Sequence, residues 1–205
     1  MIIDKIKNTN SIPEMVTLFI TINFIVQTSY KFGFLAPYGN WTLSLFSPTE
    51  LMFGNLELIF FYIMIFTGII YENAFSAILK SILFITVFPF IRVWIYTGNF
   101  TIPSSSFFAI VVGLVGYFLK NVKEDSTIEI FLFVVLLCAA PLIYGAFSSL
   151  NLQKKNLAVI ELKEQESEKW YILEKFSDSF LLVNEKNNSL KIVKIEETKT
   201  IQIIK

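Results

Sequence analysis

The sequence predicts an α-helical polytopic membrane protein with four to five transmembrane helices, followed by a small C-terminal all-β domain. Long apolar runs with few charges fill the chain before Leu150, whereas Lys and Glu are frequent in the last third. The 205 residues are 54% hydrophobic with a mean hydropathy of +0.61, against about 45–50% apolar residues in soluble domains. We therefore expect residues 1–150 to form a transmembrane helical domain and residues 157–205 to form a soluble β domain.

The first predicted span covers about residues 13–31. In Ser11-Ile12-Pro13-Glu14 a serine stands three residues before a glutamate, which is the pattern of a capping box. Asn23 and Gln27 are four residues apart and therefore share a polar helix face. Two interpretations stay open for this face: hydrogen bonds to another helix, or the lining of a pore. The aromatic-rich loop to Phe46 is typical of the headgroup zone of a membrane, with a docking surface as the alternative.

Residues 48–71 and 74–97 are predicted to form two spans joined by a short turn. The first of them begins with Ser47-Pro48-Thr49-Glu50, which combines a serine cap, a proline at the first helical position and a carboxylate three residues after the cap. Each arm is long enough to cross the apolar core of a bilayer, which takes about 20 residues. Pro89 predicts a kink in the second arm, because proline lacks the backbone N–H donor.

Each of these two arms contains one charged residue deep in its apolar run, Glu57 in the first and Arg92 in the second. At 1.5 Å of rise per residue, their depths measured from the turn at Asn73 differ by about 4–5 Å. We predict that they form an intramembrane charge pair, because an unpaired charge at this depth is costly. The alternative is that Glu57 belongs to an ion or proton path.

The last two predicted spans cover about residues 103–120 and 127–150. Ala109, Gly113 and Gly116 form a narrow face on the first of these helices, and small residues let helix backbones approach closely. This face is a candidate for helix packing, including contacts between subunits. Pro141 predicts a kink in the last span.

Beyond Asn151 the pattern changes to short β-rich runs separated by turn-like clusters, which predicts a five-stranded meander or SH3-like barrel. The domain has only about 50 residues, which is small for an independent core, so we expect it to pack on a neighbouring subunit or a soluble partner. Trp170 and Tyr171 point to opposite faces of one strand, so one ring is expected in the core and the other on the surface, and both are candidate partner-binding residues. The predicted strand runs are 157–162, 170–173, 180–183, 190–195 and 201–204.

The composition argues against most enzyme classes. The chain has no histidine and one cysteine, Cys138, which lies in an apolar run. The commonest general base and metal ligand is therefore missing, and no phosphate-binding loop, dinucleotide motif or nucleophile elbow is present. We expect no catalytic residues, no cofactor and no metal. The net charge is zero, so direct binding of nucleic acid is not expected either.

Two functions fit these expectations. The first is a non-enzymatic sensor or scaffold of the bacterial inner membrane, a homo-oligomer such as a tetramer, whose C-terminal domain recruits a soluble cytoplasmic effector. The second is an ion channel or small transporter, with Asn23, Gln27, Glu57 or Arg92 along the route. Counting Lys and Arg over five spans slightly favours an external tail, but Lys154 and Lys155 directly follow the last span, so we expect the tail in the cytoplasm.

This layout of several spans followed by a small soluble portion resembles the membrane subunit of the Kiwa bacterial anti-phage defence system. The resemblance covers the architecture of the whole chain and carries no individual residue with it. It implies a homo-oligomer that responds to phage attachment at the envelope and passes the signal to a soluble DNA-binding partner.

Overall fold

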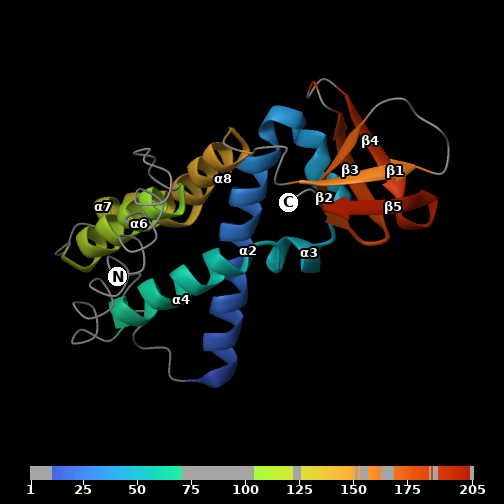
Figure 1. Cartoon of the computed structure of the whole chain (residues 1–205). Coiled ribbons are helices and arrows are strands. Elements are labelled where there is room, and N and C mark those ends of the chain that lie inside the picture. Colours follow the sequence, from blue (N-terminus) through green and yellow to red (C-terminus); the bar gives the residue numbers. More distant parts are fainter. Residues whose placement is uncertain are drawn as a thin grey trace.

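The computed structural model of the chain describes residues 11–70, 104–121, 126–150, 152, 157–162, 169–184, 186 and 189–203. Helices form the N-terminal part, and a five-stranded antiparallel sheet forms the C-terminal part, as the sequence predicts (Figure 1). The predicted third span, residues 74–97, lies outside the described residues, and Pro89 and Arg92 lie outside with it.

The helical part contains six α-helices among the described residues, with short 3-10 and π-helical turns beside them. Two 3-10 turns, η1 (Ala36–Tyr38) and η2 (Asn40–Leu45), follow the first long helix, and a π-helical turn, η3 (Val135–Ala139), joins the last two helices. The α-helices are α2 (Ile12–Leu35), α3 (Pro48–Met52), α4 (Leu56–Ile70), α6 (Ser104–Asn121), α7 (Ser126–Val134) and α8 (Ala140–Leu150). The last two continue one another through η3.

Two of the described helices are long and apolar enough to cross a membrane. They are Ile12–Tyr38, with a mean hydropathy of 1.3, and Thr127–Leu150, with 2.5. In the apolar stretch of each helix, only 22% and 33% of the residues are buried inside the protein. Most of this apolar surface therefore faces outward. Leu58–Thr67 and Ile110–Leu119 are shorter apolar helices. Length and composition therefore support membrane association through two helices, and not the whole predicted set of four to five spans.

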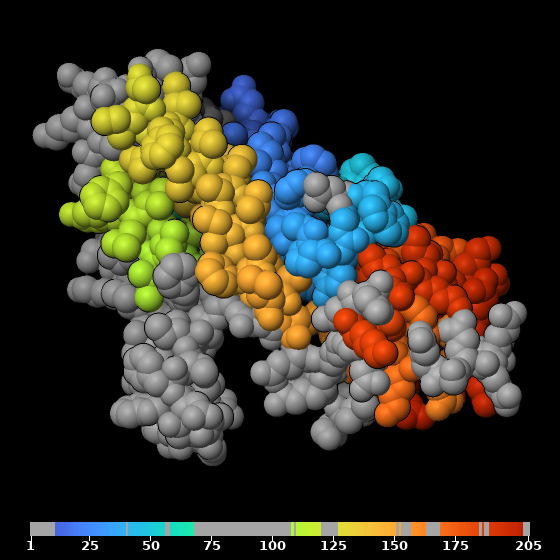
Figure 2. Space-filling view, turned by 90° about the horizontal axis from the view of Figure 1, so that it is seen from above, coloured from blue at the N-terminus to red at the C-terminus, as the bar shows by residue number. Residues whose placement is uncertain are grey.

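Glycines hold these two long helices close together. A Cβ added to Gly33 would collide with the carbonyl oxygen of Leu142, and one added to Gly145 would collide with the carbonyl oxygen of Tyr30. The backbones of α2 and α8 therefore touch where they cross, as small residues allow in membrane helix pairs. Figure 2 shows α8 lying along α2, with the sheet at the end of the pair.

The predicted helix over 48–71 is interrupted, and this expectation was wrong in its continuity. The chain leaves the helix at Phe53–Asn55 and begins α4 afterwards. Gly54 costs about 1 kcal/mol relative to alanine in a helix interior. Asn55 then acts as a new cap, because its Oδ1 accepts from the backbone N–H of Leu58 at 3.2 Å. The capping box predicted at Ser47 and Glu50 is present, at the start of the short α3.

The sequence predicts a kink at Pro141, and the structure has one π-helical turn, η3, directly before this region. Ala140 donates its N–H to Val135, five residues back. In the same register residue 141 would donate to Leu136, and proline has no N–H to give. The hydroxyl of Tyr62, on α4, donates to that Leu136 carbonyl instead. A side chain from a neighbouring helix thus satisfies the backbone group that the proline leaves open.

The sheet contains β1 (Ala158–Leu162), β2 (Trp170–Phe176), β3 (Ser179–Asn184), β4 (Leu190–Lys194) and β5 (Thr198–Ile203). Its strand order is β4-β3-β2-β1-β5, with antiparallel pairing throughout. A simple meander would place β5 beside β4. Instead a 3-10 turn, η5 (Ile195–Glu197), carries the chain across, and β5 pairs with β1.

Both faces of the sheet are covered, which explains why β3 is buried at all six of its residues. One face forms an inner cluster within the sheet, made of Ile160, Trp170, Phe180, Leu182 and Val193. The other face joins the helical part in a junction cluster, made of Phe34, Leu35, Phe46, Leu51, Tyr171, Leu173, Phe176, Leu181 and Val183. Trp170 and Tyr171 do point to opposite faces, but both are buried, at 7% and 8% exposure. The expectation of one exposed ring was wrong, because the chain's own helices cover the second face.

Candidate functional site

The junction between α2 and the sheet is the candidate functional site, and a polar stripe on α2 leads to it. Asn23, Gln27 and Lys31 follow at intervals of four residues and so lie on one helix face. Their exposures are only 6%, 0% and 3%. Polar groups buried to this degree need partners, and each of the three bonds to a group outside α2.

The first two residues of the stripe bind the chain break between α3 and α4. Asn23 donates its Nδ2 to the carbonyl of Met52 at 2.8 Å, and Gln27 donates its Nε2 to the carbonyl of Asn55 at 2.7 Å. Carbonyls at a helix end have no partner inside the helix. Met52 is such a helix end, whereas the Asn55 carbonyl already accepts from the N–H of Ile59 at 3.3 Å and gains the Gln27 amide as a second donor. Both bonds agree with the hydrogen-bonding interpretation of this face. The second amide atom of Gln27, Oε1, is buried without a hydrogen-bond partner.

Lys31 ends the stripe with an ion pair across the junction. Its ammonium bonds to the carboxylate of Glu174 on β2, and it lies 4.9 Å from the ring centre of Phe46. Lys31 is 3% exposed and Glu174 is 27% exposed. The cation is therefore desolvated on one side by an aromatic face and neutralised on the other by the sheet.

A β-bulge aims Glu174 at this lysine. Ile172 pairs with Leu182 and Glu174 pairs with Leu181, which leaves Leu173 as an extra residue on β2. Leu182 belongs to the inner cluster and Leu181 to the junction cluster. The bulge therefore shifts the alternation of β2 by one residue and turns Glu174 and Phe176 toward the helices.

A second carboxylate, Glu50 on α3, ties the turn between β2 and β3 to the helical part. Its Oε2 accepts from the backbone N–H of Ser47 at 2.7 Å, and its Oε1 accepts from the backbone N–H of Ser177. Ser177 has a φ of 47°, in the left-handed region, so this bond holds a turn residue in a sparsely populated conformation. The two backbone donors, Ser47 first, lower the pKa of the Glu50 carboxyl below its ordinary value.

These contacts join the helical part to the sheet. Among the described residues, few groups suited to catalysis or metal binding lie near them. No group of three Cys, Asp or Glu side chains that would hold a metal ion occurs among the described residues. Cys138 lies in η3, partly buried, as a free thiol. What the arrangement can do is transmit displacement, since α2, the α3–α4 break and the sheet share one chain of polar contacts.

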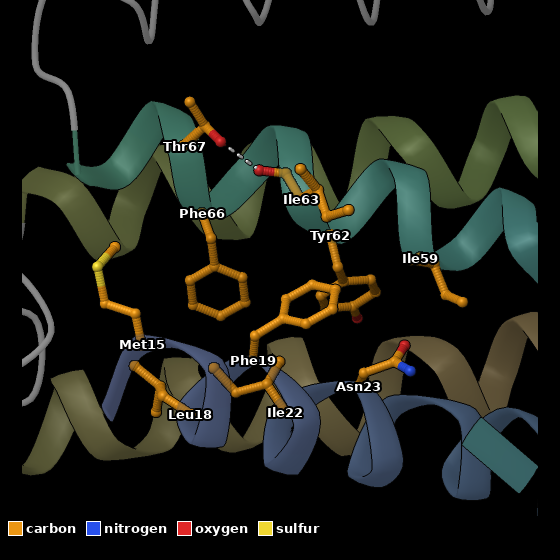
Figure 3. Close-up of a pocket in the computed structure, with 10 residues that line it drawn as sticks. All are labelled: Met15, Leu18, Phe19, Ile22, Asn23, Ile59, Tyr62, Ile63, Phe66 and Thr67. Carbon is orange, nitrogen blue, oxygen red and sulfur yellow. Dashed lines mark hydrogen bonds between the residues drawn. The ribbon is translucent and has the colours of Figure 1, made fainter. Parts of the chain in front are cut away.

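An apolar pocket of about 170 Å³ lies beside the stripe, between α2 and α4. Phe66 and Tyr62 project from α4 toward Phe19 and Ile22 on α2, and Asn23 closes one end (Figure 3). Nearly all of its lining is apolar, so it has no set of converging polar groups that would recognise a substrate.

The other sequence-predicted residues fall in several places. Glu57 lies on α4 near the break, but its predicted partner Arg92 is outside the described residues, so the charge pair stays a prediction. Gly113 is buried on α6, and a Cβ on Gly116 would meet Ile65 of α4 at 3.3 Å, so Gly116 packs within the chain. Ala109 lies on the same helix.

Sequence reasoning missed the three charged residues of the junction: Lys31, Glu50 as a contact to the sheet, and Glu174. A signal for Lys31 was present, because it continues the four-residue spacing of Asn23 and Gln27. Glu174 carried no such signal, since the bulge that turns it inward depends on pairing with β3.

Comparison with protein-family models, with curated proteins and with solved structures finds no match to this chain. The function is therefore argued from the junction itself.

Proposed function

We propose that this chain is a non-enzymatic membrane scaffold with a sensing role, which oligomerises and presents its C-terminal sheet to a soluble effector. The observation that supports this most is the buried Lys31–Glu174 pair, which couples a candidate membrane span directly to the sheet. A displacement of α2 in the membrane would reach the sheet through this pair.

The sheet has the organisation of a small interaction module. Its strand order, with β5 beside β1 and a 3-10 turn before β5, fits the SH3-like alternative better than the meander. Three apolar side chains on the strands and turn at its edges stay exposed: Ile192 at 44%, Ile195 at 36% and Ile201 at 48%. Exposed apolar residues near a sheet edge suit a protein partner better than a small molecule.

The relation between α2 and α8 supports an odd number of spans. The middle of α2 packs against η3, in the middle of the α7–α8 rod, and the ends of both helices reach the sheet (Figure 1). Leu35 of α2 belongs to the junction cluster, and Leu150 of α8 lies beside Val183. Two spans that point the same way need an even number of reversals between them. Five spans meet this condition and four do not. We place the sheet on the cytoplasmic face of a bacterial inner membrane.

The proposal is tested by affinity purification of the full chain from its native host, followed by identification and stoichiometry of soluble proteins that remain bound. We expect one soluble protein in a fixed ratio, and its loss when Ile192→Asp and Ile201→Asp are combined. Lys175→Asp, at an exposed position on β2, is the control that should keep it. A chain that purifies alone from the native host contradicts the proposal.

The alternative function, an ion channel or small transporter, is tested by ion flux into liposomes that contain the purified protein. The bonds of Asn23 and Gln27 to backbone carbonyls favour packing over a water-filled route. We expect no flux above that of empty liposomes. Flux that falls in the variant Glu57→Gln would replace the scaffold with the channel.

A role in phage defence rests on the resemblance in layout to the Kiwa membrane subunit. It predicts that the effector is a soluble DNA-binding protein encoded beside this chain. A solitary gene would remove this part of the proposal and leave the scaffold.

A further inference from the structure

The pocket between α2 and α4 lies beside the candidate membrane span that α2 forms. Its lining comes from residues 15–23 and residues 59–67 (Figure 3). The first set lies within Ile12–Tyr38, a helix long and apolar enough to cross a membrane, and the second lies within the shorter apolar helix Leu58–Thr67. The pocket therefore belongs to the apolar helices and is separate from the junction with the sheet.

The pocket is open on one side, toward the apolar surface of the helices. Met15, Phe19 and Ile63 line it and are 47%, 42% and 44% exposed, whereas Ile22 and Tyr62 line it and are buried. The three exposed side chains mark its mouth, and the two buried ones mark its floor. Since most of the apolar surface of α2 faces outward, a bilayer around this helix would bring hydrocarbon to the mouth.

The polar side chains in the lining are already engaged. Asn23, Tyr62 and Thr67 each donate a hydrogen bond to a backbone carbonyl. In that order, the acceptors are Met52 at 2.8 Å, Leu136, and Ile63 at 2.7 Å. A ligand with charged or hydrogen-bonding groups would lose its hydration in this pocket without gaining partners, whereas a hydrocarbon chain needs none.

The size of the pocket fits one hydrocarbon chain. Its volume is about 170 Å³, and apolar cavities of about 150 Å³ stay dry and accept small hydrocarbons. At 1.5 Å of rise per residue, the stretch from Met15 to Asn23 covers about 12 Å along α2. One leaflet is about 15 Å deep, which is half of a hydrocarbon core of about 30 Å. Since α2 begins at Ile12, the pocket would lie in the leaflet at that end of the helix.

We propose that this pocket binds one acyl chain of a membrane phospholipid from the leaflet at the start of α2. The chain enters beside Met15, near the membrane surface, and its methyl end lies near Asn23. The inference rests on the proposed function in one respect, which is that α2 crosses a membrane. It depends neither on the soluble effector nor on the number of subunits.

The test uses the full chain in nanodiscs of a phosphatidylcholine whose acyl chain carries a photoreactive diazirine. After irradiation, mass spectrometry of peptides measures the label in residues 15–23 and 59–67, and on the exposed face of α6 at Leu114 and Phe118. We expect at least about fivefold more label in the two pocket segments than on α6, because an enclosed chain contacts walls on several sides and a lipid at an open surface touches only one.

Two variants, Leu18→Trp and Ile59→Trp, fill the pocket from its two walls and are made separately. In each, the label in both pocket segments should fall to the level on α6. The label on α6 itself should not change, which shows that the fold is kept. Leu114→Trp is the matched control, since it adds similar bulk on the exposed face of α6 and should leave the pocket label as it is.

Three results would overturn the acyl-chain site. Equal label in the pocket segments and on α6 of the wild type would mean lipid at the surface only, and pocket label that survives both pocket-filling variants would place the chain elsewhere. Pocket segments protected from label in a dimer that Leu18→Trp dissociates would assign the pocket to a second copy of the chain. The scaffold is tested by its co-purified effector, so the two proposals fail separately.

Discussion

At the scale of single residues, the account depends on how unequally the two members of the ion pair are buried. Lys31 is almost fully enclosed, whereas about a quarter of Glu174 reaches solvent, at 3% and 27% exposure. Loss of the carboxylate would therefore cost more stability than loss of the cation. Without its partner, Lys31 would stay buried and unhydrated, whereas Glu174 would still reach water.

This asymmetry predicts unequal costs for the two single substitutions. Glu174→Leu leaves the buried Lys31 unpaired and should lower the free energy of unfolding by about 3 kcal/mol. Lys31→Met leaves a carboxylate that turns to solvent and should cost less than about 1 kcal/mol. The double variant should recover most of the loss. Thermal unfolding in detergent measures all three, and equal losses for both single variants would contradict the burial argument.

Glu50 predicts a dependence on pH with a defined sign. Its pKa is lowered in the folded protein, first by the backbone N–H of Ser47 and then by that of Ser177, so its contacts stabilise the fold when the carboxyl is ionised. That contribution is complete above the ordinary glutamate pKa of about 4.3 and is lost as pH falls through the lower folded value.

The comparison that checks this is the wild-type protein against Glu50→Gln, unfolded thermally at pH 7, 5 and 3.5. The wild type should be the more stable at pH 7 and pH 5 by a similar margin, and the margin should shrink at pH 3.5. A margin that widens on acidification would show that the bonds to Ser47 and Ser177 do not act on the ionised carboxylate.

At the scale of elements, the sequence showed where helices begin better than where they are interrupted. The capping residues Ser11, Ser47 and Glu50 carry local signals, and the structure places all three at helix starts. The break at Gly54 was missed although the sequence carries a local signal for it, because Gly54 and Asn55 interrupt the apolar run and both residue types are typical of turns. Five strands were predicted from turn spacing, but the pairing of β5 with β1 was not, since strand order is a property of long-range contacts.

The π-helical turn gives a prediction at this scale. Tyr62→Phe removes the donor to the Leu136 carbonyl and should cost about 1 kcal/mol. Pro141→Ala restores a backbone N–H near that carbonyl, so Tyr62→Phe should cost less when both substitutions are combined. Unfolding of the four proteins of this cycle gives the coupling energy, and strictly additive costs would show that the hydroxyl does not compensate for the proline.

At the scale of the whole molecule, sequence composition separated the helical part from the sheet, but it did not reveal that the two parts pack on each other. The expectation was that a sheet of about 50 residues would seek cover on another molecule. The segment from Phe34 to Leu51 provides cover instead, on the face that holds Tyr171. The packing of the sheet on the helical part could not be predicted from the sequence. It depends on the bulge at Leu173, the charge on Lys31 and the helix break lying close together in space.

The central claim is that α2 and α8 cross a membrane in the same direction, with the sheet fixed at their common end. Single cysteines at Glu14→Cys, in the first turn of α2, and at Lys186→Cys, in the exposed turn after β3, test it in a Cys138→Ser background. The measurement is labelling by a membrane-impermeant maleimide in intact spheroplasts and again after lysis. We predict that position 14 is labelled in intact spheroplasts and that position 186 is labelled only after lysis. Labelling of both positions from the same side, or recovery of the protein in the soluble fraction, would contradict the account.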